Sequence, residues 1–144
     1  MDETFEVTLD LKTGYEFQVD FQQPGVPPLV VDEPPPLGEG HGPNPSRLLA
    51  TAAANCLSAS LLHCLRRARV EVHGIHTTVR GALARNAQGR LRIGGLDVSI
   101  TVDVAPADVG RVDRCLALYE DFCVVTASLR QGVDVQVHAG AVGS

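Results

Sequence analysis

The chain has 144 residues, of which 44% are hydrophobic, enough for one domain with a core of its own. Its formal net charge of -5 argues against a nucleic-acid partner, because neutralising phosphates requires a basic surface. The one dense basic cluster, Arg66, Arg67 and Arg69, is short and is typical of the last turn of a helix, where cations complement the negative end of the dipole.

The N-terminal stretch MDETFEVTLDLK is acidic and alternating and has no secretory signal pattern, so we expect a cytoplasmic protein. No CxxC, HExxH or paired Cys/His spacing occurs, and neither GxGxxG nor GxxxxGK[ST] is found. The sequence therefore predicts no metal and no nucleotide or other cofactor. Four cysteines at spacings of 8, 51 and 8 are too sparse for a secreted disulfide framework, and we expect them to be reduced at rest.

The first segment, 1–43, is predicted to hold a hairpin and a loop. Residues 5–11 and 15–21 are rich in β-branched and aromatic side chains around a turn at 12–14, which indicates two antiparallel strands. Eight of the nine prolines then fall within 22–45. Because proline has no N–H donor, this stretch predicts an ordered loop or a short edge strand.

A long helix is predicted over 44–69. Asn44 is a favoured N-cap, and Pro45 occupies the first helical position, where its missing N–H costs nothing. Residues 48–65 carry no charge, but five polar residues are spread through them, which favours a buried helix over a membrane span. These are Thr51, Asn55, Ser58, Ser60 and His63.

The last segment, 70–144, is predicted to hold a hairpin, a second helix and a C-terminal strand. Alternation over 75–83 and 91–104, with a turn at 86–89, indicates two long antiparallel strands. Pro106 opens the second helix, a short helical segment covers 124–130, and 133–137 alternates as a closing strand. The whole chain, 1–144, is thus expected to be a single α+β domain.

The four cysteines differ in their settings. Cys64 is turned about 80° from Cys56 around the helix, and Cys115 lies on the apolar spacing of the second helix, so both fit a role as small buried hydrophobes. Cys56 lies among alanines that leave room for a neighbour, and Cys123 lies at a junction where helix amides lower a thiol pKa. Cys56 and Cys123 are therefore the candidate redox pair, although spacing alone is weak evidence.

Two stretches resemble signatures of the OsmC/Ohr family. GPNPSRLLATAAANCLSASLLHCL, at 42–65, is similar to the loop and alanine-rich central helix that carries the first cysteine of the family. YEDFCVVTASLRQGVDVQV, at 119–137, is similar to the segment of the second cysteine. Between them, VRGALARNAQGRLRIGGLDVSITVDV resembles the family's long hairpin. The resemblance implies a long buried central helix wrapped by antiparallel sheet in an intertwined homodimer.

The resemblance also implies a thiol-dependent peroxidase that reduces organic hydroperoxides without a cofactor. Cys56 would attack the peroxide as a thiolate and become a sulfenic acid, and Cys123 would condense with it to a disulfide. A dithiol reductant, lipoyl-type or thioredoxin-type, would then restore both thiols. An apolar pocket would favour organic hydroperoxides, because it buries their alkyl tails.

The sequence departs from the family pattern around the expected thiolate. Ser46 stands where the family has a glutamate that holds an activating arginine, and Val124 replaces the proline that commonly follows the second cysteine. Other residues that could stabilise a Cys56 thiolate or line its pocket are Arg47, Lys12 in the N-terminal hairpin and His41 in the glycine-rich loop.

Two alternatives remain open at this stage. A non-catalytic OsmC-like module would bind a small apolar ligand and use Cys56 only for packing. A redox sensor would stop at the disulfide and signal through a partner.

Overall fold

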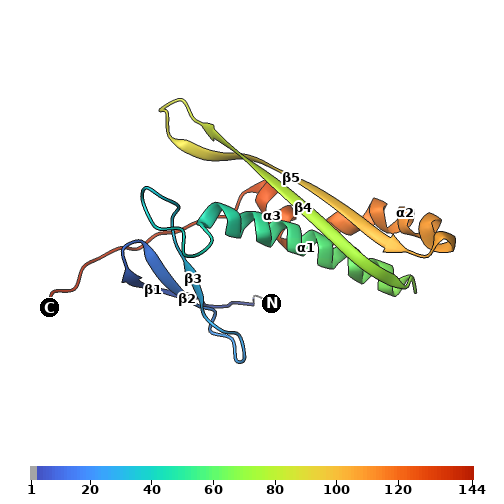
Figure 1. Cartoon of the computed structure of the whole chain (residues 1–144), viewed down its shortest axis with the longest axis horizontal. Coiled ribbons are helices and arrows are strands. Elements are labelled where there is room, and N and C mark those ends of the chain that lie inside the picture. The colour runs from blue at the N-terminus through green and yellow to red at the C-terminus, as the bar shows by residue number, and fades with distance from the viewer. Residues whose placement is uncertain (1–2) are drawn as a thin grey trace. The chain divides into compact units, whose positions relative to one another are not determined.

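The computed structural model describes residues 3–144, so Met1 and Asp2 of the acidic N-terminal stretch lie outside the described residues. The chain forms two compact units, one made of Met1–Thr51 and Val79–Asp97 and the other of Ala52–Thr78 and Val98–Ser144. Three elements run through both units: helix α1 (Pro45–Arg67) and the long antiparallel strands β4 (Val72–Arg85) and β5 (Leu91–Val104) (Figure 1). The single domain over 1–144 stays a prediction.

The first unit contains a three-stranded antiparallel sheet in the order β1-β2-β3. Strands β1 (Thr8–Thr13) and β2 (Glu16–Asp20) form the predicted hairpin, and the short β3 (Leu29–Val31) is the edge strand expected within the proline-rich stretch. Val19 on the central strand is buried and lies opposite Leu29. The alternation read from the sequence therefore identified the strands correctly.

Helix α1 begins where the sequence predicts it. The side-chain oxygen of Asn44 accepts a hydrogen bond from the backbone N–H of Arg47 at 2.9 Å, which satisfies one of the free amides of the first turn. The helix ends at Arg67, two residues earlier than predicted. Arg69 already has a left-handed φ of 59°, and the N–H of Val70 bonds back to the carbonyl of Leu65 at 2.9 Å, which closes the helix end.

Within one chain, α1 is buried on one side rather than all round. Its fully buried residues are Ala53, Ala54, Leu57, Leu61 and Leu65. The helix is long and apolar enough to cross a membrane by composition alone, with a mean hydropathy of 1.5 over its most apolar window, but core helices of soluble proteins pass the same test. Only 28% of that window is buried by the described residues, so the helix leaves apolar surface uncovered.

The second unit packs short helices against the C-terminal half of α1. A 3-10 turn η1 (Pro106–Asp108) leads into α2 (Val109–Leu118), and a second turn η2 (Tyr119–Phe122) leads into α3 (Val124–Gln131). The core of the unit joins residues of α1 and α2. Its buried members are Leu61, Leu65, Val70, Val112 and Cys115.

The predicted closing strand at 133–137 is wrong for this structure, because residues 132–144 form no regular element. Val133, Val135 and Val137 alternate as a strand would, yet their side chains are 60%, 76% and 79% exposed. A strand is stable only when its N–H and C=O groups pair with a neighbouring edge. The described residues of one chain supply no such edge to this segment.

Candidate redox site at Cys56 and Cys123

The structure brings Cys56 and Cys123 together, although they are far apart in the sequence. Cys56 lies on α1 and is partly exposed, while Cys123 is the N-cap residue of α3 and is completely buried. Both are free thiols, and each affects the pKa of the other, so the two side chains lie close together. The two candidate residues therefore occupy one site in the second unit, between α1 and the start of α3.

The two thiols differ in their readiness to ionise. Burial raises the pKa of Cys56, and its hydrogen bond to Cys123 raises it further. Burial also acts to raise the pKa of Cys123, but the Thr126 hydroxyl, the Cys56 thiol and nearby backbone amides outweigh it and lower the pKa. Of the two thiols, Cys123 is therefore the one whose ionisation its surroundings favour.

Cys56 opens into a cavity of about 540 Å³, within the size range of small-molecule sites. The cavity is formed by one face of α1 and by the two residues on either side of Cys123. Its lining is largely apolar, with cationic or titratable groups at two positions. The lining residues are Cys56, Ala59, Ser60, His63, Cys64, Arg67, Phe122 and Val124. A small apolar molecule can therefore reach the Cys56 sulfur, whereas Cys123 is shielded.

The other two cysteines form a disulfide, Cys64–Cys115, that links α1 to α2. The prediction that all four cysteines are reduced is therefore wrong for this structure, and the interpretation of this pair as independent buried hydrophobes is corrected. Cys115 is buried in the core and Cys64 lies at its edge, so the bond serves packing as well as covalent linkage. The position of each residue on its helix is compatible with a thiol or a disulfide, and only the packing of α2 on α1 distinguishes them.

The sequence did contain a signal for this pairing. Cys56 and Cys64 are eight residues apart, and so are Cys115 and Cys123. When two segments pack antiparallel, equal steps along each place the first cysteine of one beside the last of the other. This register joins Cys56 with Cys123 and Cys64 with Cys115, as the structure has them.

The remaining predicted residues belong to the first unit. Ser46 and Arg47, in the first turn of α1, line a separate cavity of about 550 Å³ together with Arg80 and Leu83. At about 100° per residue, Arg47 lies on the opposite side of the helix from Cys56. Lys12 is exposed on β1. The described residues of one unit thus do not bring these side chains to the thiols, and their roles stay predictions.

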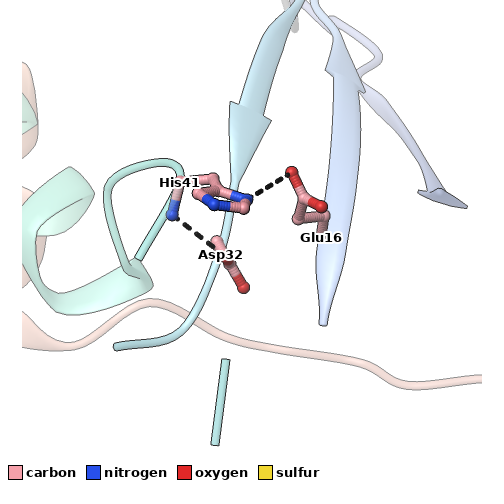
Figure 2. Close-up of side chains that lie close together, drawn as sticks. All are labelled: Glu16, Asp32 and His41. Atoms are coloured by element: carbon pink, nitrogen blue, oxygen red, sulfur yellow. Dashed lines mark hydrogen bonds and ion pairs between the residues drawn. The ribbon is translucent and has the colours of Figure 1, made fainter. Parts of the chain in front are cut away.

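His41 lies in a polar cluster with Glu16 and Asp32 (Figure 2). Its imidazole Nδ1 is 3.5 Å from the Glu16 carboxylate, and its backbone N–H donates to Asp32 at 3.1 Å. Asp32 is 2% exposed and also accepts the backbone N–H groups of Glu33 and Glu39. Its hydrogen bond with His41, together with these others, lowers the pKa of the Asp32 carboxyl against the opposing effect of burial.

This cluster explains why the proline-rich loop is ordered. Glycine is required at position 38, where a Cβ atom would collide with the Glu33 carbonyl and the Asp32 carboxylate, and at position 42, where it would collide with the Val30 carbonyl. The buried Asp32 carboxylate already has three N–H partners. These hydrogen bonds hold the loop in place before α1.

Two features near the thiols were missed by the sequence reasoning. Thr126, which lies within the second family-like stretch but was not singled out, is buried and affects the pKa of Cys123. Arg130 at the end of α3 forms an ion pair with Glu120 of η2 at 2.7 Å. Neither residue type marks a site by itself, and only the folding of η2 and α3 around Cys123 brings them near the sulfur.

Comparison with known proteins places this geometry in a family. The family model described as OsmC-like protein matches residues 38–138, a range that holds all four cysteines. The chain belongs to the OsmC-like family. No curated protein matches the sequence significantly.

Solved structures show the same fold at low sequence identity. An OsmC-like protein from Mycoplasma pneumoniae has a TM-score of 0.75 at 15% identity, with 90% of this chain and 89% of that chain covered. An organic hydroperoxide resistance protein OsmC from Legionella pneumophila has a TM-score of 0.65 at 20% identity, covering 93% and 94%. An organic hydroperoxide resistance protein from Elizabethkingia anophelis has a TM-score of 0.63 at 18% identity, with 89% of each chain covered. The α+β, OsmC-like fold predicted from the sequence is thereby confirmed.

Proposed function

We propose that this OsmC-like protein is a thiol-dependent peroxidase that reduces organic hydroperoxides through Cys56 and Cys123. The observation that carries the proposal is a partly exposed thiol in a largely apolar cavity with a second, buried thiol in contact with it. A peroxidase of this kind needs one sulfur that the peroxide reaches and a second that is close enough to close a disulfide. The organic hydroperoxide resistance proteins among its structural neighbours support the same reading.

The proposed reaction uses the two sulfurs in turn. The Cys56 thiolate attacks the outer peroxide oxygen, the O–O bond breaks, and the alcohol leaves after taking up a proton. The Cys56 sulfenic acid then condenses with Cys123 to form a disulfide and release water. A lipoyl-type or thioredoxin-type dithiol restores both thiols by exchange. The apolar lining favours an alkyl or aryl hydroperoxide over hydrogen peroxide, since only the former buries an apolar tail.

The test is a free-thiol count and an intact mass on purified protein, before and after one equivalent of cumene hydroperoxide. Because Cys64 and Cys115 are already bonded, two free thiols are expected at the start and none at the end, with a mass loss of about 2 Da. Peptide mapping should locate the new bond between Cys56 and Cys123. Survival of both thiols at this dose would refute the peroxidase and leave a ligand-binding module as the better account.

Recycling separates an enzyme from a sensor. We expect dihydrolipoamide or thioredoxin to reduce the Cys56–Cys123 disulfide and sustain many turnovers. A disulfide that both dithiols leave intact would instead favour the sensor. Since such dithiols are maintained in the cytoplasm, we propose that the protein acts there, and fractionation of cells that produce it checks this.

We further propose that the protein is a homodimer. The chain exposes 11315 Å², whereas a folded monomer of 15.3 kDa exposes about 7,100 Å². The excess is larger than the roughly 1,000–2,500 Å² that each partner of many obligate dimers buries. Exposed apolar side chains lie on β1, on β4 and β5, and along 133–137, where an alternating segment lacks an edge to pair with. Examples are Leu9, Leu11, Leu83, Leu91, Ile93 and Val135.

Light scattering on the purified protein is expected to give twice the chain mass of 15.3 kDa. Val135→Glu would place a charge in the C-terminal segment and is expected to weaken the dimer, while the exposed Gln136→Glu is the matched control. A monomeric mass at micromolar concentration would contradict this proposal without bearing on the chemistry of the thiols.

A further inference from the structure

The Cys56 thiol must ionise in order to attack a peroxide. None of the ion pairs in residues 3–144 includes a group of its cavity, although His63 and Arg67 line that cavity. Something must accept the Cys56 proton when the sulfur attacks. The Cys123 sulfur is one group able to do so, because its own pKa responds to Cys56.

Cys123 is placed to carry a negative charge. It is the N-cap of α3, so the positive end of the helix dipole and the free amides of the first turn face its side chain. The N–H groups of Val125 and Thr126 lie close enough to stabilise the sulfur as a thiolate, although they do not form a cap hydrogen bond of ordinary geometry to the thiol. A charged sulfur is the stronger acceptor and draws these donors in.

Thr126 adds an independent observation. Its residue is 8% exposed, and its hydroxyl oxygen is enclosed without a formed hydrogen bond to any described residue. An unpartnered hydroxyl in the interior is costly, and such groups call for an explanation. The one group on which it acts is the Cys123 sulfur, which belongs to the N-cap residue three positions before it in the same helix.

We propose that Thr126 is a positioning residue that holds Cys123 as a thiolate, and that this thiolate accepts the proton of Cys56 as Cys56 attacks the peroxide. The inference rests on the proposed function. In it, the Cys123 thiolate activates Cys56 in place of the arginine that the family's glutamate holds. It assigns Cys123 a role before the disulfide forms as well as in forming it.

The protons and electrons balance through one cycle. Cys56–SH passes its proton to the Cys123 thiolate while its sulfur bonds to the outer peroxide oxygen, and the O–O bond breaks to give an alkoxide. The alkoxide takes the proton from Cys123 and leaves as the alcohol. Cys123 is again a thiolate and attacks the Cys56 sulfenic acid, forming the S–S bond and releasing hydroxide. Two electrons pass from the sulfurs to the peroxide.

Other ionisable groups act on the same sulfur and must be held constant in a test. Tyr119 of η2 and Arg130 of α3 interact electrostatically with Cys123, and Glu120 pairs with Arg130. On the α1 side, the cavity beside Cys56 carries His63 and Arg67. Thr126 has no charge at any pH, so replacing it alters none of these groups and isolates the hydroxyl.

The experiment titrates Cys123 alone. In a Cys56→Ser background, with Cys64 and Cys115 bonded, Cys123 is the one free thiol, and the ultraviolet absorbance of its thiolate is followed against pH. Adding Thr126→Val, which keeps the shape and removes the hydroxyl, should move the midpoint to higher pH. Thr126→Ser should retain the midpoint, and so should Ser128→Ala, which removes an exposed hydroxyl from the same helix.

Turnover is measured in parallel with Cys56 present. A hydrogen bond to a charged group corresponds to a rate factor of about 10 to 100, so Thr126→Val should lose at least about tenfold at neutral pH and recover at alkaline pH. The variant should fold, because removing an unpartnered buried hydroxyl does not destabilise the core.

The outcomes separate the two proposals. A midpoint that Thr126→Val leaves unmoved, in a protein that turns over peroxide, overturns the inference and leaves the peroxidase intact. A protein that fails to consume peroxide but shows the shifted midpoint overturns the peroxidase and the proton transfer, while the stabilisation of Cys123 by Thr126 stands.

Discussion

Cys56→Ser is expected to remove essentially all peroxide turnover, a loss of at least about a thousandfold. The serine hydroxyl ionises far less readily than a thiol and is a poor nucleophile toward peroxide oxygen. The other sulfur that lines the cavity, that of Cys64, is bonded to Cys115 and is not a free thiol. Asn55→Ala, on an exposed neighbouring position of α1, is the control and should retain turnover. The measurement is peroxide consumption at saturating dithiol, and retained activity in Cys56→Ser would refute the assignment.

Cys123→Ser should also lose turnover, but at the step after the sulfenic acid forms. Without the second sulfur, the first equivalent of peroxide should leave Cys56 as a sulfenic acid that a dimedone-type reagent traps, and no disulfide should form. The reaction leading to the sulfenic acid should also be slowed, because the thiolate that receives the Cys56 proton is gone. A full rate for that first step would argue that Cys123 serves only as the resolving thiol.

Removing the Cys64–Cys115 disulfide is expected to produce the largest loss of stability. The bond spans 51 positions, and the chain-entropy model assigns such a loop about 4 kcal/mol of unfolding free energy. Cys64→Ala with Cys115→Ala should therefore unfold at a clearly lower denaturant concentration than the wild type. Reductant should lower the midpoint of the wild type toward that of the double variant and leave the variant unchanged.

The matched control removes the other pair. Cys56→Ala with Cys123→Ala also deletes two sulfurs from the second unit but breaks no covalent link, so it should cost less. Equal losses in the two double variants, measured by urea unfolding, would show that packing rather than the bond accounts for the effect.

Local signals in the sequence were sufficient to identify the elements. Asn44 and Pro45 start α1 because capping depends on residues within one turn, and the alternation in β4 and β5 depends on residues two apart. The prediction of a closing strand at 133–137 was wrong because it depended on more than local residues. Its alternation is local, but strand formation needs an edge that the described part of one chain does not offer.

The site could be predicted only where family resemblance replaced long-range information. The settings and spacing of the cysteines were weak evidence for joining Cys56 with Cys123, and the resemblance strengthened it. The disulfide and the Thr126 hydroxyl were missed because each depends on how α2 and α3 pack against α1. A threonine three residues after a cysteine carries no meaning until the cysteine becomes the cap of a helix.

The covalent bond between α1 and α2 has a consequence for oxidation chemistry. Four cysteines can pair in three ways, and two of those pairings would join Cys56 to the wrong partner. With Cys64 and Cys115 already bonded, an oxidised Cys56 meets a single thiol within its own chain. The Cys64–Cys115 disulfide thus prevents incorrect disulfide pairing within the chain. Each round of oxidation and reduction therefore returns the chain to the same covalent state.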